Sequence, residues 1–343
     1  MEFLFHPDNV DLTAQELYNG ASHAFRAYLH KAASEYCRLT ERTVLDADDQ
    51  VELSEQLVLG SGMLKQVLYQ FDRKKYKPVL VETEALVQLV HPITKQPLYC
   101  HCYKCRTRYL SAYPTHEDWV GWRGLPVVFG LRVDAVVVDD EGLYWVIDFK
   151  TAAQLFQDQT FLDLDLQGAS YVWALRQGLG LNIAGFLYFQ IRKTAPHPPK
   201  ELKQLNGGRR FSTAKNQLTT TRLMLSTIKQ HDRGAWNAGF YDDYLEYLRD
   251  HEPEFVKLFK VLKTPEQLTS TGTTLGKMAL VLLEPDPIIF HNPSRMTCER
   301  CSFIEPCLSM NAGHDFQDQL DSDYSIQPAY YERQRDEHAA SLD

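Results

Sequence analysis

The chain has 343 residues, of which 44% are hydrophobic and 24% charged, and its formal net charge is −9. This length allows a sizeable buried core and fits one large globular domain with insertions or two smaller domains. The first residues lack a basic segment followed by an apolar core, and no apolar run approaches about 20 residues. We therefore expect neither a signal peptide nor a transmembrane helix.

Charge is distributed unevenly along the chain. Between Asp315 and Asp343 eight acidic residues are opposed only by Arg333 and Arg335, so this segment carries −6 of the net charge. The stretch 192–222 is the reverse, with Glu201 against eight cations: Arg192, Lys193, Lys200, Lys203, Arg209, Arg210, Lys215 and Arg222. Such a stretch fits either a solvated basic loop or an arm that follows phosphates.

Seven cysteines are present: Cys37, Cys100, Cys102, Cys105, Cys298, Cys301 and Cys307. Their number is odd, no export signal accompanies them, and six of them fall in two tight groups. This pattern favours a metal site or cluster over a disulfide framework.

The first part of the chain is expected to be helical. Residues 12–75 space apolar side chains by three and four, which is typical of amphipathic helices. Residues 77–90 are rich in Val and Leu with partial alternation and predict a strand, which the turn HPITKQP follows. Residues 99–127, with the CHCYKC group, have the character of an insertion.

A strand hairpin and a helix form the most informative stretch. Residues 130–138 and 143–150 predict two strands, joined by a tight turn DDEG in which Gly142 takes a positive φ. Residues 164–178 predict an amphipathic helix, and residues 183–191 predict a further strand.

The remainder is expected to be less regular. Residues 194–220 predict an irregular arm, 290–307 an irregular segment, and 311–343 a mobile acidic tail. Helices are expected over three segments: 221–230, 242–259 and 273–284. We therefore divide the chain into four regions: a helical region 1–75, a core 76–195, a region 196–310 with the arm and the last cysteines, and the tail.

Two acids and a lysine lie on the predicted hairpin. Asp148 and Lys150 are two residues apart on a strand and so project from one face, whereas Phe149 points the other way. The hairpin brings Asp134 beside Asp148. Two carboxylates and the main-chain carbonyl of Phe149 are oxygen ligands suited to Mg²⁺ or Mn²⁺, while Lys150 positions water or stabilises charge on a phosphate.

An isolated D-x-K pattern is more often an ordinary surface ion pair. Here both acids end strongly apolar strands, where a charge needs a partner or a function. The following helix adds Gln167 and Tyr171, which share one face at i, i+4. This context favours a metal-dependent active site.

The motifs GLRVD, VIDFKTA and QGASY resemble the RecB-type branch of the PD-(D/E)XK nucleases. The resemblance implies an α/β fold with a mixed central sheet flanked by helices, and a C-terminal cysteine region. It implies that Gln167 and Tyr171 support the site or contact DNA, and that an upstream acid, Glu82 or Glu84, faces it. The central acid departs from the commoner pattern because it is Asp rather than Glu.

Cys298, Cys301 and Cys307 add a narrower resemblance, to AddB-like, CRISPR-adaptation and phage-borne iron–sulfur nucleases. In these proteins one N-terminal cysteine joins three C-terminal ones around a [4Fe–4S] cluster. Cys37 is the best candidate for the first ligand, and a structural zinc is the alternative cofactor.

The group Cys100, Cys102 and Cys105 competes for the role of fourth ligand. These cysteines otherwise bind a separate Zn²⁺ with His101 or His116, or are three reduced thiols in an insertion.

We therefore expect a Mg²⁺- or Mn²⁺-dependent deoxyribonuclease, an exonuclease acting on single-stranded DNA or on free DNA ends in recombination, repair or replication. Arg192, Lys193, Arg209 and Arg210 are the expected DNA contacts. We expect a cytoplasmic protein of a bacterial or phage-infected cell, with no membrane contact, a recombination or replication partner, and self-association. The alternatives are a DNA-end-binding module with little activity and a regulatory iron–sulfur module.

Overall fold

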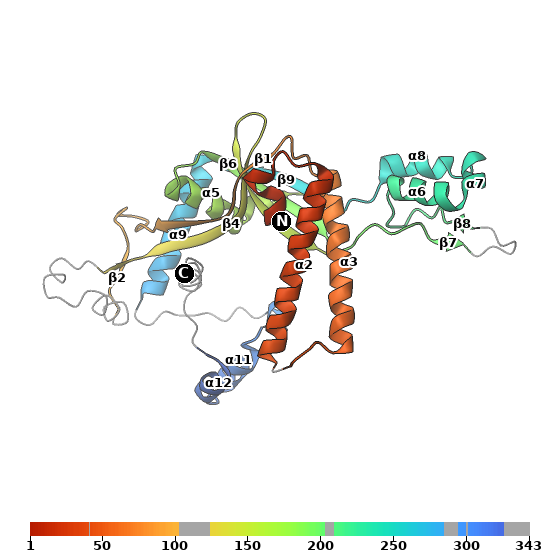
Figure 1. Cartoon of the computed structure of the whole chain (residues 1–343). Coiled ribbons are helices and arrows are strands. Elements are labelled where there is room, and N and C mark those ends of the chain that lie inside the picture. Colours follow the sequence, from red (N-terminus) through yellow and green to blue (C-terminus); the bar gives the residue numbers. More distant parts are fainter. Residues whose placement is uncertain (41, 103–123, 203–208, 285–293, 300, 326–343) are drawn as a thin grey trace.

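A five-stranded mixed sheet forms the centre of the computed structural model, which describes residues 1–40, 42–102, 124–202, 209–284, 294–299 and 301–325. The strand order is β1-β4-β5-β6-β9. Their bounds are β1 Lys77–Gln88, β4 Val128–Val138, β5 Tyr144–Ala152, β6 Ile183–Arg192 and β9 Val256–Leu262. The mixed sheet and its flanking helices confirm the predicted fold class (Figure 1).

The pairing directions follow from the connections. β1, β4 and β5 are antiparallel neighbours, and the turn between β4 and β5 contains Gly142 at φ 79°, as predicted. β5 and β6 are parallel, and α5 (Leu166–Gly178) makes the crossover that a parallel pair requires. β9 closes the sheet as an antiparallel edge strand.

One face of the sheet is covered by the N-terminal helices. The helices are α1 (Glu2–Phe5), the 3-10 helix η1 (Pro7–Asn9), α2 (Ala14–Leu39) and α3 (Ala47–Gln70), and α2 and α3 each begin with a capping box. Their buried apolar residues form one cluster with Trp145, Ile147 and Phe149 of β5. We call this side the hairpin face of the sheet, after the hairpin of α2 and α3 that covers it.

The opposite face is covered by α5 and α9 (Pro265–Leu283). Val172 and Leu175 of α5 pack there against Val146 and Phe186. Gly168 allows the close approach, because a Cβ at this position would lie 2.5 Å from the Phe186 ring. We call this side the α5 face.

Residues 201–202 and 209–251 form a small helical module beside the sheet (Figure 1). Two short strands, β7 (Glu201–Leu202) and β8 (Arg210–Phe211), pair with each other, and α6 (Thr221–His231), α7 (Arg233–Asn237) and α8 (Asp242–His251) follow. The module has an apolar cluster of its own, which includes Phe211, Met224 and Tyr241. The expected basic arm is therefore partly a packed element.

Two expectations about the second half of the chain are wrong. Residues 256–259 were expected to continue a helix, but they belong to β9. Pro253 disfavours helical conformation in the residue before it, and the sequence after Phe255 alternates, with Phe259 and Val261 buried. The segment 290–307, expected to be irregular, includes α10 (Arg295–Cys298) and the start of α11 (Ile304–Asn311). A further helix, α12 (Gln317–Asp323), lies in the acidic tail.

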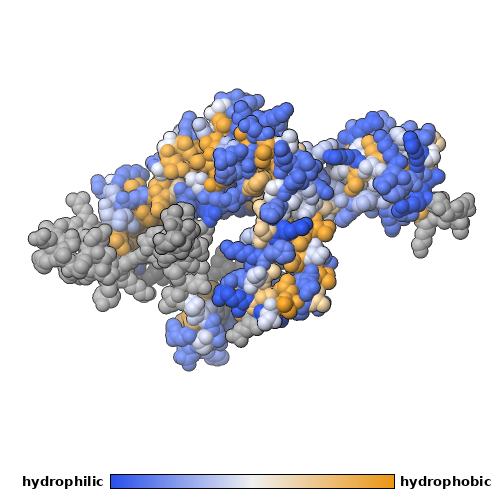
Figure 2. Space-filling model, in the orientation of Figure 1, coloured by the Kyte–Doolittle hydropathy of each residue, from blue (hydrophilic) through white to orange (hydrophobic). Residues whose placement is uncertain are grey.

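The expected insertion begins and ends in a two-stranded ladder of β2 (Tyr99–Cys100) and β3 (Leu125–Pro126). Apolar surface gathers on the α2–α3 hairpin, where Leu39, Val51 and Val58 are exposed (Figure 2). In the part of the chain that the structure describes, no helix combines the length and apolar composition needed to cross a bilayer.

Candidate active site

Asp148 and Lys150 form an ion pair on β5, with 3.0 Å between Lys150 Nζ and Asp148 Oδ1. Asp148 is only 5% exposed, whereas the Lys150 side chain is about one third exposed. Their neighbours Tyr144 and Val146 pack on the α5 face, and Trp145, Ile147 and Phe149 pack on the hairpin face. The predicted alternation along this strand is therefore confirmed.

The electrostatics of this pair follow from its burial. Burial raises the pKa of Asp148, and the charges of Asp134 and Asp165 add to the rise, while Lys150 opposes it. Partial burial acts against the charge of Lys150, yet its hydrogen bond to Asp148 leaves the pKa of Lys150 raised. Asp148 thus carries a buried charge that further cationic partners would stabilise.

Asp134 lies where β4 and β5 separate. The ladder between these strands ends at Ala135 and Ile147, so Asp134 and Asp148 come directly after the last pair. Asp134 Oδ2 accepts a hydrogen bond of 2.8 Å from the main-chain N–H of Phe149. The structure therefore brings Asp134 to the main chain of the D-x-K motif.

β1 and β4 both change face at this point. In a regular strand residues 133 and 135 share a face, but Val133 packs on the α5 face and Ala135 on the hairpin face. On β1, Val81 packs on the hairpin face and Ala85 on the α5 face, and Glu82 between them has a φ of 45°. A positive φ is rare for a residue other than glycine and concentrates at functional positions.

The two upstream acids, Glu82 and Glu84, differ in their surroundings. Glu82 lines a cavity together with Asp134 and is paired with Arg132 at 2.6 Å, whereas Glu84 is exposed and does not line that cavity. The geometry favours Glu82.

The cavity has a volume of about 1020 Å³ and lies between the N-terminal helices and the sheet. Helix side chains such as Phe25, Tyr28 and Met63 form its apolar part. Its sheet side is lined by Glu82, Asp134, Phe149, Thr151, Ile191 and Lys193. From the sheet side, two acids and one cation therefore face a largely apolar space beside the D-x-K motif.

Gln167 and Tyr171 lie on the first turns of α5 and are joined by a hydrogen bond of 2.8 Å from Gln167 Nε2 to the Tyr171 hydroxyl. Burial and the charge of Asp148 raise the pKa of Tyr171. The predicted helical pair therefore lies close to Asp148 and Lys150.

Three further residues near the pair were missed by sequence reasoning. Tyr188 and Gln190 on β6 are the register partners of Asp148 and Lys150. Asp165 caps α5 by accepting a hydrogen bond from the Gln167 N–H, and its charge acts on Asp148. The sequence IAGFLYFQI contains no local pattern that indicates a role for Tyr188 and Gln190. Their position next to Asp148 and Lys150 becomes evident only from the register between β5 and β6.

The oxygen donor atoms of this site are of the types that bind a hard divalent cation. Among the described residues no group of three or more His, Cys, Asp or Glu side chains is arranged to hold a metal ion. The arrangement offers instead two carboxylates, Asp134 and Asp148, and the main-chain carbonyl of Phe149 between Asp148 and Lys150. Oxygen donors of this kind are the ones that Mg²⁺ and Mn²⁺ prefer.

Comparison with known families decides the relationship. The model of the PD-(D/E)XK nuclease superfamily matches residues 10–307. This chain belongs to that superfamily. No curated protein matches the chain. Membership indicates a nuclease that binds DNA, and nucleases of the superfamily typically use Mg²⁺ or Mn²⁺.

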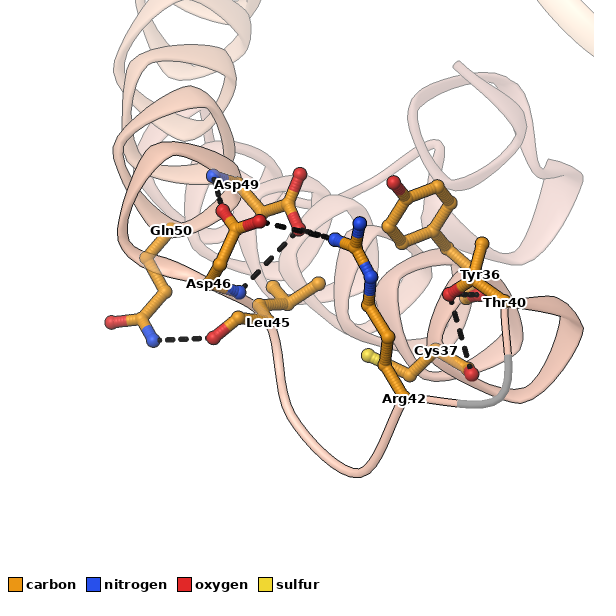
Figure 3. Close-up of polar contacts among 8 residues, drawn as sticks. All are labelled: Tyr36, Cys37, Thr40, Arg42, Leu45, Asp46, Asp49 and Gln50. Atoms are coloured by element: carbon orange, nitrogen blue, oxygen red, sulfur yellow. Dashed lines mark hydrogen bonds and ion pairs between the residues drawn. The ribbon is translucent and has the colours of Figure 1, made fainter.

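The expected iron–sulfur ligands of this nuclease do not form a metal-binding group among the described residues. Cys37 lies in the last turns of α2, beside a cavity of about 580 Å³ that Arg42 and Gln50 also line. Figure 3 shows the corner between α2 and α3, where Arg42 pairs with Asp46 and Asp49. None of the described cysteines belongs to a metal-binding group, and Cys105 lies outside the described residues.

Cys298 and Cys301 are linked through their main chains, with the Cys301 N–H donating to the Cys298 carbonyl at 3.2 Å. Cys307 follows in α11. Cys100 lies in β2, and Cys102 is exposed beside it. Among the described residues, none of these cysteines forms a metal-binding group with Cys37.

The expected DNA contacts differ in their surroundings. Lys193 is exposed and lines the cavity that contains Asp134, and Arg192 ends β6. Arg209 forms an ion pair with Glu201 at 2.6 Å, and Arg210 pairs with Asp232 at 3.1 Å and lies over the Phe240 ring. Arg209 and Arg210 therefore both have an acidic partner within the module.

Proposed function

We propose that this superfamily member is a metal-dependent deoxyribonuclease that degrades DNA from a free end. One observation carries the proposal: the buried Asp148 is paired with Lys150 at 3.0 Å, and Asp134 is bonded to the intervening Phe149 N–H. An ordinary surface ion pair would not place a carboxylate in a buried position beside other acids, because burial without compensation costs free energy.

Asp134, Asp148 and the carbonyl of Phe149 would hold the divalent cation, with Glu82 beside them. A bound Mg²⁺ or Mn²⁺ polarises the phosphodiester and lowers the pKa of the attacking water. Lys150 would donate a hydrogen bond to that water or to a phosphate oxygen. Tyr171, fixed by Gln167, would orient Lys150 or the substrate from the α5 face.

The surroundings of the site support a DNA end as the substrate. The cavity is bounded by α1, α2 and α3 on one side and by the sheet on the other, so it suits a terminal segment of a strand. Lys193 lies in it with the acids and would contact a phosphate of that segment. We include Arg192, Arg209 and Arg210 as further DNA contacts. Processing of DNA ends belongs to recombination, repair or replication.

The experiment is degradation of single- and double-stranded DNA labelled at the 5′ or the 3′ end, with Mg²⁺ or Mn²⁺. An exonuclease releases the label as mononucleotides or short fragments at once from one end and late from the other. Binding of the DNA without degradation in either metal would favour a DNA-end-binding module. Internal cuts on a circular substrate would contradict the requirement for an end.

We also propose that Cys37, Cys298, Cys301 and Cys307 hold a [4Fe–4S] cluster. The support is the spacing Cys298-x2-Cys301-x5-Cys307 in a member of this superfamily, and the proximity of Cys298 to Cys301 through their main chains. Zinc is the competing occupant.

A further inference from the structure

An exposed aromatic ring lies one strand away from the paired Asp148 and Lys150. Phe156, in the segment between β5 and α5, stacks on Tyr188 with 5.9 Å between ring centroids and 6° between ring planes. Tyr188 is the register partner of Asp148 on β6. Phe156 is 49% exposed, so much of its ring is open to solvent.

The segment that carries Phe156 is fixed to the sheet. The Phe156 N–H donates to Gln190 Oε1 at 2.7 Å, and Gln190 is only 1% exposed and faces Lys150 in the register. Lys257 Nζ contacts the Gln157 carbonyl at 3.4 Å, and Lys263 Nζ donates to the Asp163 carbonyl at 2.7 Å. The position of the Phe156 ring is thus tied to the positions of the proposed catalytic residues.

The same segment presents two more apolar side chains to solvent. Phe161 and Leu164, in the 3-10 helix η3 (Thr160–Leu164), are each 81% exposed, while Leu162 between them is buried in the core. An anchored segment that exposes three large apolar side chains next to a candidate active site gains little folding free energy from them. A planar ligand would gain contact area there.

We propose that the face of Phe156 stacks against an unpaired nucleobase adjacent to the scissile phosphate. The inference rests on the proposed nuclease function and names its substrate more closely, as DNA that is single-stranded at the point of cutting. Stacking on an aromatic ring tolerates every base, because each base has a π face, so the contact would fix the strand without selecting a sequence. A paired base has both faces covered within the duplex and could not stack in this way.

The test is a double-mutant cycle in which one change is made in the protein and the other in the DNA. Cleavage of a single-stranded oligonucleotide at subsaturating concentration is compared for the wild type and Phe156→Ala, with an abasic residue at each position flanking the scissile bond. We expect one abasic position to slow the wild type about tenfold, as the loss of one stacked base should. On intact DNA, Phe156→Ala should cleave more slowly than the wild type by a similar factor. An abasic residue at the same position should not slow Phe156→Ala further. Phe156→Trp should cleave intact DNA at the wild-type rate.

The control is Tyr69→Ala, which removes an exposed aromatic ring of α3 outside the site and should respond to the abasic position like the wild type. Equal losses from the abasic residue in the wild type and in Phe156→Ala would overturn the inference, as would an unchanged rate of Phe156→Ala on intact DNA. Fluorescence anisotropy with the same oligonucleotides gives the same cycle without cleavage. Failure of the nuclease assignment alone would abolish cleavage and leave this binding cycle intact.

Discussion

The carboxyl group of Asp148 has opposing neighbours in the folded protein. Burial raises its pKa, and Lys150 only partly compensates. Since the folded state then binds the proton more readily than the unfolded state, the free energy of unfolding falls as the pH rises from the ordinary pKa of Asp, about 3.9, through the raised value. The buried charge of Asp148 therefore lowers the free energy of unfolding, which is consistent with a residue that serves to bind a cation rather than to stabilise the fold.

Replacing Asp148 by Asn should therefore stabilise the metal-free protein at neutral pH. We expect the melting temperature of Asp148→Asn to exceed that of the wild type at pH 7 and the difference to shrink towards pH 4. Thermal unfolding in the presence of a chelator over this range measures it. A lower melting temperature for Asp148→Asn at pH 7 would show that the ion pair with Lys150 outweighs the burial of Asp148.

Glu82 and Glu84 form a matched pair of upstream acids. Glu82 lines the cavity with Asp134, and Glu84 is exposed outside it. We expect Glu82→Gln to slow DNA cleavage about tenfold or more, because a charge beside the metal ligands is lost, and Glu84→Gln to stay within about twofold of the wild type. Rates measured at several metal concentrations would show this, and equal rates for the two variants would remove Glu82 from the site.

Contacts that follow from local spacing were predictable from the sequence. Asp148 with Lys150, and Gln167 with Tyr171, are joined at i, i+2 and i, i+4, and both pairs are found in contact. Tyr188 and Gln190 were not predictable, because their relation to Asp148 and Lys150 depends on the register of a parallel pair that α5 separates in sequence. The face change at Glu82 was also hidden, since alternation assumes a regular strand.

At the level of elements, the β4–β5 hairpin and α5 were predicted because turn chemistry and periodicity specify them locally. β9 was not, because its sequence follows a helix closely and pairs with β6 across the intervening module. The helices α6 and α8 of the module were also predicted, but residues 194–220 were predicted as an irregular arm. Their Gly- and Pro-rich sequence does not indicate that Phe211 packs into the apolar cluster of the module.

The cations at the end of β6 and in the module are the residues with which we expect this acidic protein to bind DNA. We expect Lys193→Ala to lower DNA affinity and to reduce the salt dependence by about one unit of slope, and Arg209→Ala with Arg210→Ala to reduce it by about one to two units. Arg38→Ala is the control, because Arg38 is an exposed cation of α2 paired with Glu35. Binding measured across a salt series would exclude the module as a DNA contact if the slope of the double variant equals that of the wild type.

At the scale of the whole molecule, a cluster would join the two ends of the chain. Cys37 lies in the N-terminal helices, and Cys298, Cys301 and Cys307 follow the sheet and α9. Anaerobically purified protein should then be brown, with broad absorbance near about 400 nm, and Cys298→Ala should lose iron and melt at lower temperature, since ligation couples distant segments to folding. Stoichiometric zinc without iron in elemental analysis would replace the cluster by a structural zinc site.

The central claim is that Asp134, Asp148 and Lys150 cut DNA. The most direct measurement is the rate of degradation of end-labelled single-stranded DNA with Mg²⁺ or Mn²⁺, for the wild type and for the three single alanine variants. Asp140→Ala is the control, since Asp140 is an exposed acid in the turn of the same hairpin. We expect each of the three variants to lose about a thousandfold or more in rate while unfolding cooperatively like the wild type, and Asp140→Ala to keep full activity. Cleavage by Asp148→Ala at the wild-type rate would contradict the account.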